Sequence, residues 1–433
     1  MRQVERHIVK ETSPLWKQID NLCFLSKNLY NYANYLIRQS FIFEKVYLRF
    51  NQVYHKVKDQ PDYQALPRKV SQQVLRVLDK NWQSFFAANK AYQEIPDKFT
   101  GRPKLPKYKH KIKGRNLLIY TIQAISQTGL KQGIVKLSGT NIAIPTLAQN
   151  IALARIIPKV GQYVIEIVYE KDEHSSVTNP KAIAAIDIGV DNLATLTSNQ
   201  KGFVPILVNG RPLKSLNQFY NKTKALLQSQ LRGKQQTSKR IQKLTAKRNN
   251  RVDTYLHQAS RWIIDYLDNR GIGKLIIGQN PLWKQEVNNG KKNNQSFVSI
   301  PHARLVEMLI YKGAMKGIKV VCSEESYTSK ASFLSLDSIP TYGDDGANKV
   351  KFSGYRETRG MYKIKGKKLR INADVNGSYN IMRKAMKCGL GGFPHEQLHQ
   401  EVIPTVFDQG IEGVVVRPIR ITPGRAKICQ CYI

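Results

Sequence analysis

Three carboxylates in the second half of the chain stand where acids often hold metal ions. Asp187 lies in the apolar run AIAAIDIGV, Glu324 and Glu325 come at the end of IKVVCSE, and Asp374 begins NADVNGSYNIMRKAM. Three acids that converge at the edge of a sheet repel one another unless a cation joins them. Oxygen-only ligation selects Mg²⁺ or Mn²⁺ over zinc. Two such ions about 4 Å apart can activate water and stabilise the leaving oxygen in phosphodiester hydrolysis.

Each of these acids has a simpler explanation, because Asp and Glu commonly cap turns and helices. Acids are scarce in this chain, with 31 Asp and Glu against 69 Lys and Arg, so their combination favours hydrolysis of a nucleic acid. Neighbours on a regular strand point to opposite faces, so only one of Glu324 and Glu325 can reach a shared cation. The residues alone do not say which.

Composition points to a polyanionic partner. The 433 residues are long enough for two or three domains, and 41% of them are hydrophobic, which is ordinary for a globular protein. The net charge of +38 is not ordinary, and it favours phosphate contacts over a ribosomal-type scaffold or a membrane surface. The chain has no apolar run near 18 residues, and its start lacks a signal-peptide core. Five mostly isolated cysteines suit a reducing compartment, so we expect a cytoplasmic protein without membrane contact.

The first half of the chain changes pattern twice. Residues 2–9 alternate polar and apolar like a strand, and residues 15–48 and the stretch after Pro67 have helical spacing. The segment GRPKLPKYKHKIKGR follows, where prolines forbid helix and positive charge is dense, including Lys107 and Lys109. Residues 116–170 are typical of short strands with turns. We therefore expect a helical block inserted between a first strand and a small β domain.

After a polar linker at residues 170–181, strands and helices alternate, which predicts an α/β domain with a mixed sheet. Between Arg211 and Arg251 a dozen basic residues occur without any acid, on helical spacing. We expect this segment to contact nucleic acid, and the candidate residues are Lys239, Arg240, Lys243, Lys247, Arg248 and Arg251.

Several motifs resemble the TnpB family, the transposon-encoded RNA-guided nucleases related to type V CRISPR effectors. They are AIDIGVDNLATLT, SKRIQKLTAKRNNRVDTYLHQASRWIIDYL, WKQEVNNGKKNNQSFVSIPHARLVEML, EESYTSKASF, FSGYRETRGMY and NADVNGSYNI. The resemblance covers roughly residues 100–385 closely. It implies an RNase H-like RuvC domain beside a small β-barrel wedge domain that carries a helical recognition insert. The implied boundaries are 1–12 with 103–177 for the wedge, 13–102 for the recognition insert and 178–433 for the nuclease, with a nucleic-acid-binding insertion near 335–370.

The resemblance also implies an activity. Such proteins bind a guide RNA, recognise a short motif beside the target, unwind double-stranded DNA and cut it with one two-metal RuvC site that uses Mg²⁺, with Mn²⁺ as a substitute. It adds nucleic-acid contacts at Lys291 and Lys292, and at Arg356 and Arg359 in the insertion, where basic and aromatic residues suit single strands. A protein of this kind would work in a prokaryotic cytoplasm, at the nucleoid.

The chain departs from the usual pattern of the family at two places. Where most members have the second RuvC acid, this chain has Gly278 and Gln279. One branch instead places a glutamate two residues before the tyrosine that is Tyr327 here, which makes Glu325 the expected third catalytic and metal-binding acid beside Asp187 and Asp374. Glu286 is the rival. The second departure is that no Cys-x-x-Cys pair of a zinc ribbon flanks residues 335–370.

Two other functions use the same residues. A protein that has lost cleavage would act as an RNA-guided DNA-binding repressor, and a cut-and-paste transposase would use the acids for strand transfer. The sequence leaves open the guide RNA, the adjacent motif, the oligomeric state and whether the locus is a transposon or a CRISPR array.

Overall fold

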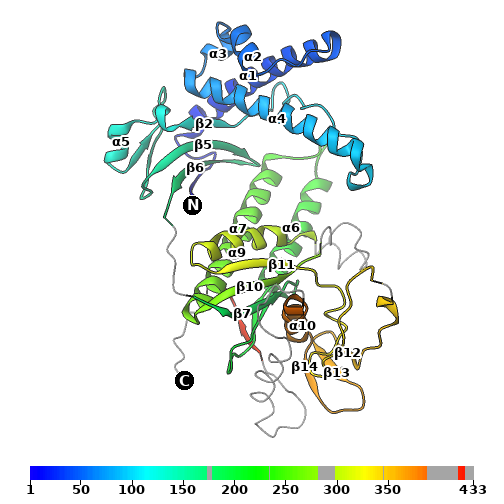
Figure 1. The fold of residues 1–433 in the computed structure, drawn as a ribbon. Helices are drawn as coiled ribbons and strands as arrows, with labels where there is room; N and C mark the ends of the chain where they lie inside the picture. Colours follow the sequence, from blue (N-terminus) through cyan, green and yellow to red (C-terminus); the bar gives the residue numbers. More distant parts are fainter. Residues whose placement is uncertain (173–177, 234, 281–297, 345, 388–417, 425–433) are drawn as a thin grey trace. The chain divides into compact units, whose positions relative to one another are not determined.

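A computed structural model describes residues 1–172, 178–233, 235–280, 298–344, 346–387 and 418–424 (Figure 1). The chain forms two compact units. Unit 1 is Met1–Asp172 with Thr237–Ala246, and unit 2 is Glu173–Gln236 with Lys247–Ile433. The finer domain boundaries implied by the resemblance stay predictions. Among the described residues, no helix has both the length and the apolar character that crossing a membrane requires.

The strands of unit 1 form an antiparallel sheet. Strand β1 (Arg2–Val9) alternates in exposure as its sequence predicts, and it pairs along its whole length with β6 (Gln162–Glu170). The sheet order is β1-β6-β5-β2, where β5 is Ile151–Lys159 and β2 is Leu118–Thr121. Beside it are the hairpin of β3 (Ile134–Lys136) and β4 (Ala143–Pro145) and the short helix α5 (Gln127–Lys131). In the described part of the chain, β1 and β2 form the edges of this sheet, so the closed barrel is not confirmed.

The helical block of unit 1 lies between β1 and β2. Its helices are α1 (Trp16–Gln39), α2 (Phe50–Val57), α3 (Pro61–Gln64) and α4 (Arg68–Glu94). The helix expected over residues 15–48 is shorter, because a π-helical turn follows it at Ser40–Glu44 and Lys45 adopts a left-handed φ of 61°. Trp82 is fully buried at the centre, where its Nε1 donates to Asn34 Oδ1 at 3.0 Å.

Unit 2 is built on the mixed six-stranded sheet that the alternating pattern predicts. Its order is β11-β10-β7-β8-β9-β15, with β7–β8–β9 antiparallel and β10 and β11 parallel to β7. The strands are β7 (Asn179–Asp187), β8 (Asn192–Ser198), β9 (Ile206–Asn209), β10 (Ile272–Gly278), β11 (Lys319–Ser323) and β15 (Ile419–Ile421). β7 and β10 read as almost unbroken apolar runs because both of their faces are covered.

Helices cover the two faces of this sheet. Side chains of α7 (Lys239–Asn269) and α9 (His302–Ala314) pack on one face, with α6 (Arg211–Ser229) joining the same core, and α10 (Ala373–Lys387) packs on the other. The first turns of α7 belong to unit 1 and the remainder to unit 2. A small sheet of β12 (Gly354–Thr358), β13 (Met361–Ile364) and β14 (Arg370–Asn372) leads directly into α10 (Figure 1).

Candidate active site and nucleic-acid contacts

The three predicted acids come from the same edge of the unit 2 sheet. Parallel pairing places Ile277 opposite Ile186 and Gly278 opposite Ser323. The carboxyl ends of β7, β10 and β11 are therefore level, and this is the edge where open α/β sheets bind ligands. Asp187 is the last residue of β7, and Glu325 follows β11 by two residues. Asp374 lies in the first turn of α10, which packs on β7.

The Asp187 carboxyl is buried and is affected by the charges of the other two acids. Burial raises the pKa of this carboxyl well above its usual value, the negative charges of Asp374 and Glu325 raise it further, and the charge of Arg356 lowers it. Helix α10 approaches closely because Gly377 has no side chain: a Cβ there would stand 2.7 Å from Asp187 Oδ2. Asp187 is thus a carboxylate held among other acids with little compensating charge.

The Glu325 carboxylate lies over Gly278, at the end of β10. A Cβ on Gly278 would lie 2.6 Å from Glu325 Oε2, so this carboxylate reaches over the end of β10 and occupies the space of a side chain there. The Glu325 amide donates to Asn280 Oδ1 at 3.0 Å, which fixes the turn. Burial raises the pKa of Glu325 to about 7, the charge of Glu324 adds to this, and Lys384 opposes it.

The Glu324 carboxylate has other partners than that of Glu325. It forms an ion pair with the buried Lys384 of α10 and accepts a hydrogen bond from the Ser326 amide at 2.6 Å. Burial alone would raise its pKa, but these hydrogen bonds and the Lys384 charge lower it. Strand β11 ends at Ser323, so both glutamates lie just beyond the regular strand on which the alternation argument depended. Their side chains nevertheless have different partners, and Glu325 is the one whose charge acts on Asp187.

Asp374 is held from two sides. Asn192 Nδ2 donates to Asp374 Oδ2 at 2.7 Å, and the Arg356 guanidinium lies 3.7 Å from Asp374 Oδ1. Asn192 is the first residue of β8, and Arg356 lies on β12. The arginine predicted for nucleic-acid contact therefore reaches the acidic edge itself.

Arg359, the second predicted arginine of the insertion, pairs with Asp191 at 3.2 Å. Asp191 also accepts a hydrogen bond from Lys214 at 2.9 Å. Burial would raise the pKa of Asp191, but the lysine bond and the Arg359 charge lower it below its usual value. Arg359 itself is 72% exposed, so its charge remains available to an incoming phosphate.

The donor chemistry of this edge fits an oxygen-preferring cation. In the described ranges, no three His, Cys, Asp or Glu side chains are close enough together to hold one metal ion. Burial raises the pKa values of Asp187 and Glu325, and the charges of nearby acids raise both further. Carboxylate oxygens are the ligands that Mg²⁺ and Mn²⁺ prefer.

The six predicted residues of the basic segment have different surroundings. Lys239 and Lys243 pair with Glu11 within unit 1, at 2.8 and 3.0 Å. Arg248 donates to Asn217 Oδ1 and to the Ser299 carbonyl, at 2.8 and 2.7 Å, and burial lowers its pKa. Lys239 and Lys243 stay exposed in these pairs, and the remaining three residues, Arg240, Lys247 and Arg251, are exposed as well.

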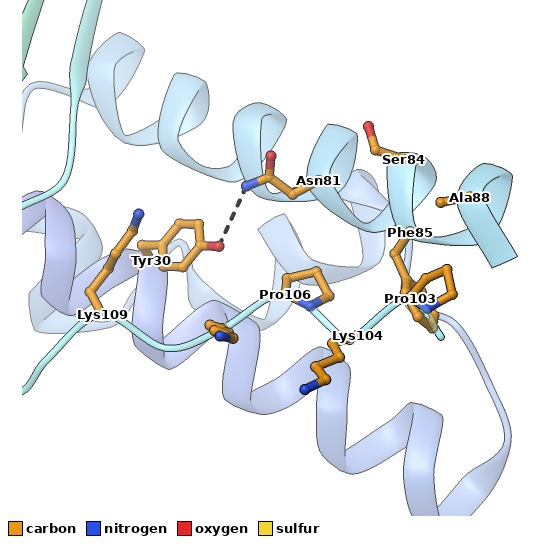
Figure 2. A pocket seen from close by; sticks show the side chains of 10 residues that line it. Tyr30, Asn81, Ser84, Phe85, Ala88, Pro103, Lys104, Pro106 and Lys109 are labelled. Atoms are coloured by element: carbon orange, nitrogen blue, oxygen red, sulfur yellow. Dashed lines mark hydrogen bonds between the residues drawn. The ribbon is translucent and has the colours of Figure 1, made fainter. Parts of the chain in front are cut away.

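Lys107 and Lys109 line a pocket of about 390 Å³ in unit 1 (Figure 2). Its walls include Tyr30 of α1 and Phe85 of α4. The stretch GRPKLPKYKHKIKGR, which contains both lysines, is held extended along α1, where Asn31 exchanges two hydrogen bonds of 2.8 Å with the Lys109 backbone. The Lys109 ammonium lies 5.4 Å from the centre of the Tyr30 ring. Aromatic walls beside lysines are the surroundings that bind nucleotides by stacking and phosphate contact.

Sequence reasoning missed several residues of the site. Asn192 and Lys384 lie in the quoted stretches AIDIGVDNLATLT and NADVNGSYNIMRKAM, but their acid partners, Asp374 and Glu324, are more than 50 residues away in the chain. Gly377 had a signal: in DVNGS it lies three residues after Asp374, on the same helical face. The predicted contacts Lys291 and Lys292, and the rival acid Glu286, lie outside the described residues.

Two family models match parts of this chain. The OrfB_IS605 family, described as a probable transposase, matches residues 166–283, and the Cas12f1-like TNB domain matches residues 302–381. A CRISPR-associated endodeoxyribonuclease Cas12f2 of Micrarchaeota archaeon (strain CG1_02_47_40) is 25% identical over 239 residues. These matches support a TnpB/Cas12f-type family. The two family matches contain all three acids, and the family expected from the sequence is thereby confirmed.

The relatives match this chain over different shares of their own length. The match to Cas12f2 covers 52% of this chain but only 40% of the relative's length. A solved Cas12f1–sgRNA–target DNA complex covers 88% of this chain and 98% of its own, at 14% identity and a TM-score of 0.33. The mini-RNA-guided endonuclease CRISPR-Cas_phi3 covers 89% of this chain and 92% of its own, at 9% identity and a TM-score of 0.45. These structural likenesses are too loose to carry conclusions on activity.

Proposed function

We propose that this protein is an RNA-guided DNA endonuclease that cuts with one site formed by Asp187, Glu325 and Asp374. The observation that carries the proposal is the position of Glu325 over Gly278, at the carboxyl edge of the mixed sheet where β7 ends at Asp187. A carboxylate there replaces the acid that this family member lacks at the end of β10. We interpret unit 2 as an RNase H-like RuvC domain, and the sheet and helices of unit 1 as a wedge domain with its recognition insert.

The proposed cofactor is Mg²⁺, in two ions, with Mn²⁺ as a substitute. When bound, such ions activate water and stabilise the leaving oxygen of a phosphodiester. Asp187, Glu325 and Asp374 would hold them, and binding would relieve the repulsion that raises the pKa of Asp187. Asn192 would keep the Asp374 carboxylate in place through its 2.7 Å hydrogen bond.

The proposed partners are a guide RNA and a double-stranded target DNA with an adjacent motif. Base pairing would read the sequence, and the protein would hold the backbone. Support comes from the net charge of +38, from the exposed Arg240, Lys247 and Arg251, and from the pocket beside Lys107 and Lys109. Arg356 and Arg359 would bring the DNA phosphate to the acids, since both already lie on carboxylates of that edge. The proposed place of action is the prokaryotic cytoplasm, at the nucleoid.

One assay tests the function. The protein is purified with its co-expressed RNA and incubated with Mg²⁺ and a plasmid library that carries a guide-matched target. Double-strand cutting is expected beside one short motif. Asp187→Ala and Asp374→Ala should each stop cutting and spare target binding, because only the cation site is removed. Binding without cutting by the wild-type protein would identify a repressor instead, and joined strands would identify a transposase.

A further inference from the structure

One face of the small sheet β12-β13-β14 packs on the core, and the other carries a row of polar side chains (Figure 1). Tyr362 of β13 and Ile371 of β14 lie opposite each other, are buried and join the α10 core. The next row crosses all three strands, with Tyr355 opposite Lys363 and Lys363 opposite Arg370. Opposite residues share a face and neighbours along a strand alternate, so this row faces away from the core. Tyr355 is 45% exposed there.

Glu357 joins this outward row at a β-bulge. The pairing of β12 with β13 shifts between Arg356 and Thr358, so Glu357 is the extra residue, and bulges re-aim side chains. Its carboxylate accepts hydrogen bonds from Arg370 Nε and Nη2 at 2.7 and 3.1 Å, and its Oε1 lies 3.4 Å from Lys363 Nζ. The Arg370 hydrogen bond contributes most to lowering the pKa of this carboxyl, which is therefore ionised at neutral pH.

Two cations that hold one carboxylate can hold one phosphate in the same way. The planar fork of arginine binds carboxylate and phosphate oxygens bidentately, and lysine adds a point charge. Residues 354–372 contain seven Lys and Arg against one acid, and that acid, Glu357, lies on this pair of cations. An exposed ion pair stabilises a protein only slightly, so sheet stability is a weak reason for its place. A carboxylate in this position excludes a phosphate from it.

The ring of Tyr355 indicates which phosphate compound fits. An exposed tyrosine beside basic residues can stack on an unpaired base, whereas the bases of a duplex are already stacked on one another. Arg356, the next residue of β12, lies 3.7 Å from Asp374 at the acidic edge. The strand that carries the ring thus also reaches the candidate cutting site, which favours the DNA to be cut over the guide RNA.

We propose that Tyr355, Lys363 and Arg370 form a binding site for one nucleotide of single-stranded DNA, in which a carboxylate of the protein competes with the phosphate. The base stacks on Tyr355, and the phosphate takes the place of the Glu357 carboxylate on the two cations. This competition lowers the affinity for any strand that the site alone holds. The choice of DNA rests on the proposed nuclease function.

The test measures binding of a fluorescent oligo(dT) strand by anisotropy. The protein is loaded with a guide RNA that does not match the strand and is kept in EDTA, so neither guide pairing nor cleavage contributes. Glu357→Gln, Arg370→Gln and the double variant form a thermodynamic cycle. Glu307→Gln is the matched control, because it removes the same charge from an exposed position on α9. Tyr355→Ala is compared with Tyr355→Phe, which keeps the ring, and the melting temperature of each variant is recorded.

Glu357→Gln should bind the strand about threefold to tenfold more tightly than the wild-type protein. Arg370→Gln should weaken binding, and the double variant should lose most of the gain, because the carboxylate competes through this arginine. Tyr355→Ala should weaken binding at least about fivefold, whereas Tyr355→Phe should keep it.

Unchanged or weaker binding by Glu357→Gln overturns the inference and makes this residue a brace of the sheet. A gain of equal size without Arg370, or in Glu307→Gln, also overturns it, since any lost negative charge would then act alike. Tighter binding of oligo(rU) than of oligo(dT) would overturn DNA as the ligand. None of these results depends on cleavage. A protein that binds as expected but never cuts a guide-matched target keeps this site and loses the proposed nuclease function.

Discussion

Glu324 and Glu325 are adjacent residues with opposite surroundings. Lys384 compensates Glu324, whereas Glu325 lies among acids over the end of β10. Charge without a partner cation is what a metal ligand contributes, so only the second residue has the character that the proposed chemistry needs. The family resemblance favoured Glu325, and its position gives that choice a physical reason.

Replacing each glutamate by glutamine should separate the two roles. Glu325→Gln keeps the shape and removes the charge, so we expect the single-turnover cleavage rate to fall by about a hundredfold or more. Glu324→Gln should affect cleavage much less and lower the melting temperature, because Lys384 loses its ionic partner. Target binding, measured by mobility shift, should persist in both. Loss of cleavage in Glu286→Gln with full activity in Glu325→Gln would refute the assignment.

The pH dependence of stability offers a test without substrate. Folding raises the pKa of Glu325 from its usual 4.5 to about 7, so the folded state binds this proton more tightly than the unfolded state. Stability is therefore lost as the pH rises from about 4.5 to 7, and the full penalty is present above 7. In EDTA, Glu325→Gln should raise the melting temperature more at pH 8 than at pH 5. Equal gains at both pH values would show that Glu325 is not held in this environment.

At the scale of elements, two glycines determine how closely the sheet and α10 bring the acids together. The missing side chain of Gly278 gives room to Glu325, and that of Gly377 lets α10 approach Asp187. The close approach of the sheet and α10 at these two points requires that neither glycine carries a methyl group.

Adding that methyl group should damage the site more than the fold. Gly377→Ala would displace Asp187, and Gly278→Ala would displace the Glu325 carboxylate together with the buried Ile381 side chain, whose Cδ1 would lie 2.4 Å from the added carbon. A displacement near 1 Å costs about a hundredfold in rate when geometry matters. We expect cleavage to fall by about 10–100-fold in each with RNA binding kept, and Gly278→Ala should also lower the melting temperature because it overpacks the core at Ile381. Gly360→Ala is the control, because nothing lies within 4 Å of its added carbon. Full activity in Gly278→Ala would mean that Glu325 does not act from this position.

The elements of unit 2 were largely predictable because their signals are local. Apolar runs and helical spacing predicted β7, β10, β11, α9 and α10, and parallel strands bring their carboxyl ends to one edge. The contacts within the site were not predictable, since the Asn192 bond to Asp374 spans 182 residues. The break after α1 was also missed, because a π-helical turn has no clear pattern of apolar residues.

At the scale of the whole molecule, a large positive charge does not mean that every basic residue is available to a partner. Within the basic segment, the Arg248 guanidinium is held by Asn217 and the Ser299 carbonyl, whereas Lys239 and Lys243 pair with Glu11 but stay exposed. Reversing the charges of all these residues together would not separate a loss of folding stability from a loss of RNA binding. Exposed Lys247 and Arg251 remain as the informative pair in unit 2.

Reversing Lys247 and Arg251 to Glu should therefore weaken RNA binding without loss of fold. Each lost phosphate contact lowers the slope of log K against log salt by roughly one, so the double variant should lose about two units of slope and copurify with less RNA. Lys201→Glu, an exposed reversal between β8 and β9, is the matched control and should leave the slope nearly unchanged. Arg248→Glu should instead lower the melting temperature, because its internal hydrogen bonds are lost. If the double variant kept the wild-type salt slope, Lys247 and Arg251 would not be RNA contacts.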